Sequence, residues 1–127
     1  MRIVQITDLH VGQEGQDTQG VDVRANFLKV RDAIQSLNPD HVVVSGDLCF
    51  TDGEKPVYNW IKPHLDELNI PYDIISGNHD DSVLLAQAFG LENLLINKEL
   101  YFHKKLGNKE VLFLDTSIGI VSDNQLH

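Results

Sequence analysis

Three short motifs carry side chains of the kind that bind metal ions. They are Asp8-Leu9-His10, Gly46-Asp47 and Gly77-Asn78-His79-Asp80, and each follows directly on a short apolar run. Carboxylate, imidazole and amide groups suit a catalytic Mn, Fe or Zn site, whereas a structural zinc site is built mainly from cysteine thiolates. If the fold brings the three motifs together, they predict a catalytic centre for divalent metal ions.

The residue types within these motifs suggest separate roles. Asp8 and His10 are two residues apart, and on an extended segment this spacing points both side chains to the same side, where they can hold one metal ion. Asp47 can bridge that ion to a second one through its two carboxylate oxygens, and Asn78 offers the second ion a neutral oxygen. His79 is better placed as an acid than as a ligand.

The elements that must position the motifs follow from hydrophobic patterns. Runs rich in β-branched residues predict buried strands at 3–6, 41–45 and 72–76, in a sheet covered on both faces. Apolar residues at helical spacing predict one helix from Val23 to Leu37 and another from Tyr58 to Leu68, in which Pro63 makes a kink or starts a new turn. This order predicts an α/β fold with parallel strands, whose C-terminal ends bring the motifs to one crevice.

The chain after residue 80 predicts smaller elements. A helix is expected over residues 83–89, capped by Asp81 or Ser82 and ended by Gly90. A hairpin follows, with strands at 101–106 and 111–115 and a turn at Gly107-Asn108. Residues 122–126 resemble the start of a helix, and the polar loop 12–20 beside the first strand is of a kind that is often functional.

Composition narrows the class of protein. Ten Lys and Arg against nineteen Asp and Glu give a net charge of −9, which argues against a surface that binds nucleic acid. A phosphate substrate would need another source of positive charge. The only cysteine is Cys49, so no intrachain disulfide can form, and no segment predicts a signal peptide or a membrane span. We therefore expect a cytoplasmic protein, with residues 1–127 forming a single domain.

Several chemically active residues outside the motifs have simpler interpretations. His41 and His64 are expected at the surface or at a strand end rather than as ligands, and Cys49 as a small buried residue rather than a reactive thiol. Asp80 orients the ring of His79 or caps the following helix, and the two roles are compatible. Asp115 is expected to be a plain loop carboxylate.

Together the motifs resemble those of the calcineurin-like metallophosphoesterase superfamily. That superfamily opens with Asp-x-His, Gly-Asp and Gly-Asn-His-Asp or Gly-Asn-His-Glu, in the order found here. The surroundings of the motifs, at 39–48, 70–80 and 113–126, look like the cyclic-nucleotide phosphodiesterase branch. The resemblance implies the N-terminal half of an αββα sandwich, and hydrolysis of a phosphodiester or phosphomonoester by a metal-activated hydroxide.

The resemblance also implies what each residue does. Asp8, His10 and Asp47 would hold one divalent ion, and Asp47 and Asn78 would hold the other, with Mn, Fe or Zn as candidates. His79 would protonate the leaving oxygen. The ions would supply the positive charge that the acidic chain lacks, and the substrate would be a phosphoester such as a cyclic nucleotide.

The chain departs from the superfamily in one respect. The family adds three further histidines in later motifs, and the only histidines after Asp80 are His103 and His127, which lie outside those patterns. We therefore expect residues 1–127 to be an incomplete domain: a fragment of a longer protein, a truncated gene product, or a half that is completed by pairing with another chain. The alternative is an inactive metal-binding or assembly module. A nucleotide binder of the Rossmann type has little support, because no Gly-x-Gly-x-x-Gly follows the first strand.

Overall fold

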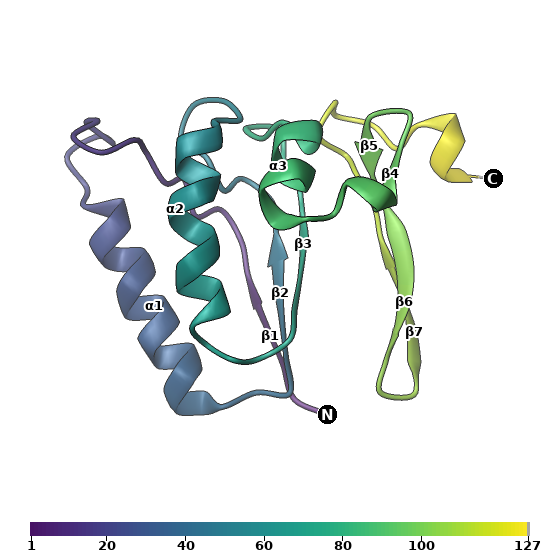
Figure 1. Cartoon of the computed structure of the whole chain (residues 1–127), viewed down its shortest axis with the longest axis horizontal. Helices are drawn as coiled ribbons and strands as arrows, with labels where there is room; N and C mark the ends of the chain where they lie inside the picture. Colours follow the sequence, from purple (N-terminus) through teal and green to yellow (C-terminus); the bar gives the residue numbers. More distant parts are fainter. Residues whose placement is uncertain (127) are drawn as a thin grey trace.

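The computed structural model describes residues 1–126 and is organised around a parallel three-stranded sheet. Strands β1 (Ile3–Ile6), β2 (His41–Ser45) and β3 (Tyr72–Ile75) lie side by side in that order. Helices α1 (Val23–Leu37) and α2 (Lys55–Asp66) form the two crossovers (Figure 1). Because both crossovers step across the sheet in the same direction, right-handed connections put both helices on one face. The predicted α/β fold is confirmed.

The helix ends follow the capping rules. At the start of α1 the side chain of Asp22 accepts a hydrogen bond from the amide of Ala25, and at its end Asn38 has left-handed backbone with φ of 46°. Helix α2 continues through Pro63 to Asp66, so this proline does not start a separate element. Helix α3 (Ser82–Phe89) is capped by Asp81 and ends at Gly90, as predicted.

The core lies between the sheet and the helices. Val42 and Val44 of β2 and Ile74 of β3 face the helices. They pack into one cluster with apolar side chains of α1 (Phe27, Ile34), α2 (Val57, Tyr58, Ile61, Leu65) and α3 (Leu85, Ala86, Phe89). Burial of this side of the sheet fixes the register of the strands, because a slip of one residue would turn the apolar side chains away from the core.

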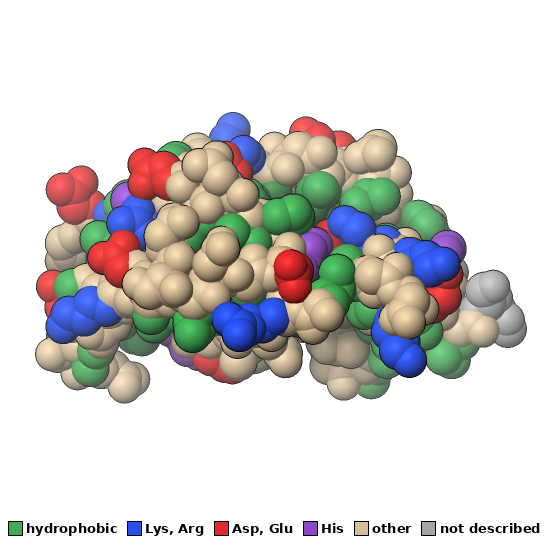
Figure 2. All heavy atoms as spheres, turned by 90° about the horizontal axis from the view of Figure 1, so that it is seen from below, with side chains coloured by type: hydrophobic (Ala, Val, Ile, Leu, Met, Phe, Trp, Pro, Cys, Tyr) green, Lys and Arg blue, Asp and Glu red, His purple; other side chains and the backbone are tan. Residues whose placement is uncertain are grey.

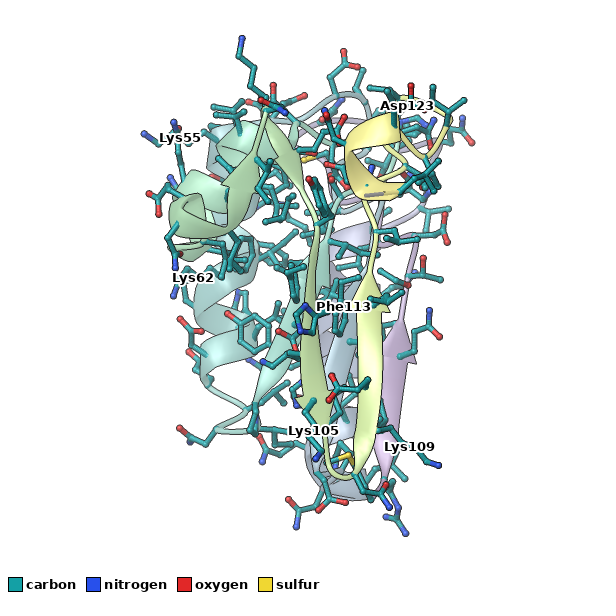
Figure 3. All side chains as sticks on the ribbon, turned by 90° about the vertical axis from the view of Figure 1, so that its right-hand side faces the viewer. Lys55, Lys62, Lys105, Lys109, Phe113 and Asp123 are labelled. Carbon is teal, nitrogen blue, oxygen red and sulfur yellow. The ribbon has the colours of Figure 1, made fainter. Side chains whose placement is uncertain are left out.

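Two antiparallel hairpins follow α3 and the short 3₁₀ turn η1 (Glu92–Leu94). The first pairs β4 (Leu95–Ile96) with β5 (Glu99–Leu100) and was not predicted, since two-residue strands leave no periodic pattern. The second pairs β6 (Phe102–Leu106) with β7 (Lys109–Phe113) across the predicted turn. A last 3₁₀ turn, η2 (Asp123–Leu126), stands where the start of a helix was expected. In Figure 3, Lys105 and Lys109 lie near the turn of the second hairpin and Asp123 lies toward its other end.

The second face of the sheet is open on β1, so the prediction that both faces would be covered was wrong. On this strand Ile3 is 45% exposed. At β3 the second hairpin lies against the sheet through Lys104, whose Nζ is 3.1 Å from Oδ1 of Asp73. His41, expected at the surface or a strand end, is buried at the start of β2, where its Nε2 is 2.7 Å from Oδ2 of Asp73. A carboxylate on the neighbouring strand satisfies the ring, which makes burial of the histidine tolerable.

The end of the molecule that carries the N-terminal ends of the strands has a mixed surface. Figure 2 shows acidic and basic side chains interspersed on this face, with hydrophobic side chains between them. Within residues 1–126, none of the helices combines the length and apolar character needed to cross a bilayer.

Candidate metal centre

The segments that follow β1 and β2 run side by side beyond the sheet. The amide of Asp8 donates to the carbonyl of Gly46 at 3.1 Å, and the amide of His10 donates to the carbonyl of Asp47 at 2.9 Å. One residue further, Val11 donates to Leu48 at 2.8 Å. These bonds extend the parallel pairing past the strand ends, and they hold the first two motifs next to each other.

The backbone at the site corrects the expected extended geometry. Asp8, His10 and Asp47 have φ values of 56°, 47° and 50°, so all three lie in the left-handed region. Side chains other than glycine enter this region at a cost of about 1 kcal/mol or more, and residues held there cluster at functional sites. Left-handed backbone, rather than the alternation of a strand, therefore places the side chains of Asp8 and His10 together.

The donor atoms of these three residues converge. Nε2 of His10 is 3.6 Å from Oδ1 of Asp8 and 3.9 Å from Oδ2 of Asp47. One ligand atom from each residue lies within 4.8 Å of the other two. Asp47 is the least exposed, with 15% of its side chain accessible, against 35% for His10 and 59% for Asp8. Two carboxylates and an imidazole in this arrangement form a candidate site for a divalent cation.

Neighbouring groups orient both carboxylates. The single hydrogen of the Thr7 hydroxyl is shared between two acceptors, Oδ2 of Asp8 at 2.8 Å and the carbonyl oxygen of Ser45 at 3.1 Å. The amide of His79 donates to Oδ1 of Asp47 at 3.0 Å, which leaves Oδ2 on the side of His10. Partners of this kind restrict the rotation of a ligand before any ion binds. Thr7 was missed by sequence reasoning, because a threonine at a strand end has no distinctive spacing.

The third motif approaches Asp47 so closely that glycine is required. A Cβ atom built on Gly77 would lie 2.3 Å from Oδ1 of Asp47 and 2.5 Å from its amide nitrogen. Next to this contact, Asn78 is exposed and lines a hollow of about 530 Å³ together with Asp8 and Asp47. The structure therefore brings all three motifs to one edge of the sheet.

Replacement of Gly77 by alanine is expected to damage the site. The new methyl group would displace the carboxylate of Asp47, so we expect the affinity of Gly77→Ala for Mn²⁺ to fall by about tenfold or more. Titration followed by electron paramagnetic resonance would measure the affinity. Gly15→Ala is the control: with a φ of 78° alanine strains the backbone there, but no atom lies within 4 Å of the added Cβ and the residue does not line the hollow. Equal affinities in the two variants would contradict the predicted displacement.

His79 is held by two carbonyl groups. Its Nδ1 lies 3.1 Å from the oxygen of Phe50 and 2.9 Å from that of Thr51. Carbonyl oxygens only accept hydrogen bonds, so Nδ1 carries a hydrogen and Nε2 is the nitrogen that can gain or lose a proton. The ring packs edge-on against His10, with 5.2 Å between the ring centroids.

Asp81 caps α3 as expected, whereas Asp80 has neither of the two roles expected of it. No hydrogen bond joins Asp80 to the ring of His79 among the described residues, and the cap of α3 is Asp81. Asp80 instead accepts hydrogen bonds from the amides of Leu48 and Gly77, one from each motif loop, at 2.9 to 3.2 Å. It also accepts from the amide of Cys49 and the hydroxyl of Tyr58. Asp80 thus joins the loop of Asp47 to the loop of Asn78.

The remaining candidates are Cys49 and His64. Cys49 is fully buried, as predicted, and burial raises the pKa of its thiol to about 12, so it is not a reactive thiol. His64 is partly buried and packs against Trp60, with 4.6 Å between the ring centroids. Neither residue belongs to the site.

Asp115 is buried and hydrogen-bonded, so the prediction of a plain loop carboxylate was wrong. It is 2% exposed and accepts hydrogen bonds from the hydroxyl of Ser82, the amide of Leu100 and both the amide and hydroxyl of Ser117. Burial acts to raise the pKa of this carboxyl group, but the hydrogen bonds from Ser117, Ser82 and Leu100 outweigh burial, so the pKa lies below its ordinary value. No pattern in the sequence indicates these partners, because they lie in three separate segments of the chain.

The stability of the fold should depend on the ionisation of Asp115. Because the pKa of Asp115 is lowered in the folded state, its ionisation stabilises the fold at pH values above the ordinary pKa of 3.8. This contribution is lost as the pH falls through the folded pKa. We expect Asp115→Asn to lower the free energy of unfolding by about 2 kcal/mol at pH 7. In urea titrations the difference from the parent chain should shrink below about pH 4. A difference independent of pH, or an equal loss in the exposed control Asp52→Asn, would contradict this role.

The chain is similar to several known proteins. The model of the calcineurin-like phosphoesterase family matches residues 1–125. A protein of Fibrobacter succinogenes named as a probable cyclic nucleotide phosphodiesterase is 32% identical over 126 residues, which cover 99% of this chain and 49% of that protein. The DNA double-strand break repair protein Mre11 of Methanococcus maripaludis is 35% identical over 140 residues, covering 99% of this chain and 37% of that protein.

A solved structure shows the same fold. A purple acid phosphatase from yellow lupin seeds superposes with a TM-score of 0.55 at 19% identity, over 91% of this chain and 24% of that chain. The chain spans about half or less of the length of these curated relatives. The match of the family model over nearly the whole chain, together with the motifs that meet at one edge of the sheet, shows that this chain belongs to the calcineurin-like phosphoesterase family.

Proposed function

We propose that the chain provides a divalent-metal centre for the hydrolysis of phosphodiesters. The observation that carries this proposal is the convergence of Asp8, His10 and Asp47, whose ligand atoms lie within 4.8 Å of one another at the C-terminal edge of a parallel sheet. Ligands bind at this edge in open α/β sheets. Membership of the phosphoesterase family supports the reaction type.

A cyclic nucleotide is the substrate that we propose first. The support comes from the similarity to proteins named as cyclic nucleotide phosphodiesterases, among them the relative from Fibrobacter succinogenes. The single buried thiol, Cys49, is consistent with the reducing cytoplasm, where we place the protein.

The donor set fits divalent ions. Asp8, His10 and Asp47 would hold one ion, and Asp47 and Asn78 would contribute to a second, with Mn, Fe or Zn suited to such nitrogen and oxygen ligands. When bound, such ions act as Lewis acids that lower the pKa of water and neutralise charge on the phosphoryl group. Without them Asp8 and Asp47 place negative charge in the hollow, which opposes binding of a phosphate.

The remaining residues prepare the site. Thr7 and the amide of His79 fix the two carboxylates, and Asp80 holds the loops that carry Asp47 and Asn78. We propose that Nε2 of His79 delivers a proton to the leaving oxygen. The carbonyls of Phe50 and Thr51 retain the hydrogen on Nδ1, so the transferable proton resides on the nitrogen opposite to them.

The proposal is tested by measuring metal content and turnover in the same preparation. The chain is stripped with EDTA, reloaded with Mn²⁺ and assayed with bis(p-nitrophenyl) phosphate, 3′,5′-cyclic AMP and p-nitrophenyl phosphate. We expect Mn²⁺ to bind and turnover to return on reloading, with the diesters preferred over the monoester. Turnover that is unchanged by EDTA, or absence of Mn²⁺ binding, would contradict a metal-dependent phosphodiesterase.

An inactive assembly module is the second candidate, and a specific observation favours it. Large apolar side chains are exposed in the last part of the chain, including Leu112 at 72%, Ile118 at 68% and Leu126 at 67%. Exposed apolar groups of this size are typical of surfaces that associate with another chain or another copy. Mn²⁺ binding without turnover, combined with a concentration-dependent mass in analytical ultracentrifugation, would select this candidate.

A further inference from the structure

The hollow beside the metal centre has one wall that the three motifs do not supply. Thr116 and Gly119 line it together with Asp8, Asp47 and Asn78. They belong to a turn in which the amide of Gly119 donates to the carbonyl of Thr116 at 2.8 Å. Gly119 has a φ of 89°, a conformation that glycine adopts without strain. We call residues 116–119 the wall turn.

The wall turn is anchored at its first end. Directly before Thr116, the amide of Asp115 donates to Oε1 of Gln125 at 2.8 Å, and Nε2 of Gln125 donates to the carbonyl of Asp115 at 2.7 Å. The side chain of Asp115 is buried and accepts from Ser117 within the turn. These bonds fix the position of Thr116 before any ligand arrives.

A buried hydrogen-bonded chain ties the wall turn to the third motif. The hydroxyl of Ser76 is 2.6 Å from the hydroxyl of Ser82, which donates to Oδ2 of Asp115 at 2.6 Å. Ser76 immediately precedes Gly77-Asn78. The relative position of Asn78 and Thr116 is therefore set by fully engaged buried groups, which hold their geometry well.

Among residues 1–126, the hydroxyl of Thr116 lines the hollow without any hydrogen-bond partner of its own. Three hydroxyl side chains line the hollow, and they belong to Thr7, Ser45 and Thr116. Thr7 donates to Oδ2 of Asp8, and the oxygen of Ser45 accepts from Nε2 of Gln5 at 2.8 Å, which holds the Ser45 hydroxyl in place but leaves its hydrogen free. Thr116 is exposed, and within residues 1–126 its hydroxyl has no hydrogen-bond partner. Its donor is free for a molecule that enters the hollow.

We infer that Thr116 is a substrate-binding residue, whose hydroxyl donates a hydrogen bond to an oxygen of the phosphoryl group held in the hollow. This inference rests on the proposed function, because the acidic hollow accepts a phosphate only when divalent ions are present. A hydroxyl that lines the same hollow as the metal ligands would fix the orientation of the phosphoryl group. Hydrogen bonds to charged groups are stronger than those between neutral groups.

The test uses inorganic phosphate as the probe and the chain loaded with Mn²⁺. Isothermal titration calorimetry gives the Kd of phosphate, and electron paramagnetic resonance gives the Kd of Mn²⁺. We expect Thr116→Val to raise the Kd of phosphate about tenfold, Thr116→Ser to keep the parent value within about threefold, and neither to change the Kd of Mn²⁺. Ile118→Ala, in the same turn but outside the lining of the hollow, should bind phosphate like the parent.

The outcomes separate this inference from the proposed function. If the parent chain binds no Mn²⁺, or binds phosphate equally well without Mn²⁺, the proposed function fails. If the parent binds phosphate in the presence of Mn²⁺ and Thr116→Val binds it equally well, the inference about Thr116 is overturned. An equal loss in Thr116→Ser, or a weakened affinity for Mn²⁺, would likewise overturn it, since either result indicates damage to the turn. Should Thr116→Val fail to fold, the smaller Thr116→Ala replaces it with the same expectation.

Discussion

Replacement of Asp47 by asparagine is expected to weaken metal binding at the site severely. The amide side chain would keep the size of the original and an oxygen that can accept from the amide of His79, but it would lose the charge that faces His10. Loss of a group that merely orients a ligand weakens metal binding by about 10- to 100-fold, so loss of a charged ligand should cost more than about 100-fold. Turnover of phosphodiesters should fall with the occupancy of the metal.

The control for this variant is Asp52→Asn. Asp52 lies further along the same loop and is exposed. Its replacement removes the same charge from the chain without changing the donor set of Asp8, His10 and Asp47. Mn²⁺ titrations of both variants, with circular dichroism to verify the fold, make the comparison. If the two variants bound Mn²⁺ equally well, Asp47 would not be a ligand.

Replacement of His79 by glutamine should affect substrates according to their leaving groups. If Nε2 supplies a proton to the leaving oxygen, loss of the imidazole costs most when that oxygen is a poor leaving group. For 3′,5′-cyclic AMP, which expels an alkoxide, we expect kcat to fall about 10²- to 10⁴-fold. For bis(p-nitrophenyl) phosphate, whose leaving group is stable without a proton, the loss should be much smaller.

His64→Gln serves as the matched control, because His64 lies on α2 and packs against Trp60. It should leave kcat for both substrates unchanged. The affinity for Mn²⁺ should stay the same in His79→Gln, since its backbone amide still donates to Asp47. An equal loss of kcat for both substrates would indicate that His79 has a structural role, and the proposed proton transfer would be wrong.

The sequence predicted the framework of this site well, because the framework follows from local patterns. Parallel strands after helical crossovers place residues 8, 47 and 78 at one edge, and the apolar spacing of α1 and the capping residues of α3 are visible in the sequence. The resemblance to a known family supplied the roles of the residues. Periodicity alone would have indicated the edge of the sheet but no chemistry.

What the sequence could not predict depends on contacts between distant residues. The pairing of His41 with Asp73 and the burial of Asp115 against Ser82 join residues that are far apart in the chain, and neither leaves a periodic signal. The backbone of Asp8 and His10 was expected to be extended and is left-handed, because its hydrogen bonds to Gly46 and Asp47 set its course. Thr116 was missed for the same reason, since its place on the wall of the hollow is a property of the assembled fold.

The location of a bound ion tests the central claim most directly. Crystals of the chain grown with Mn²⁺ would be measured on both sides of the manganese absorption edge. The account predicts a peak in the anomalous difference map in contact with Asp8, His10 and Asp47. A map with no peak there, in crystals that hold manganese elsewhere on the chain, would contradict the assignment of these residues as a metal centre.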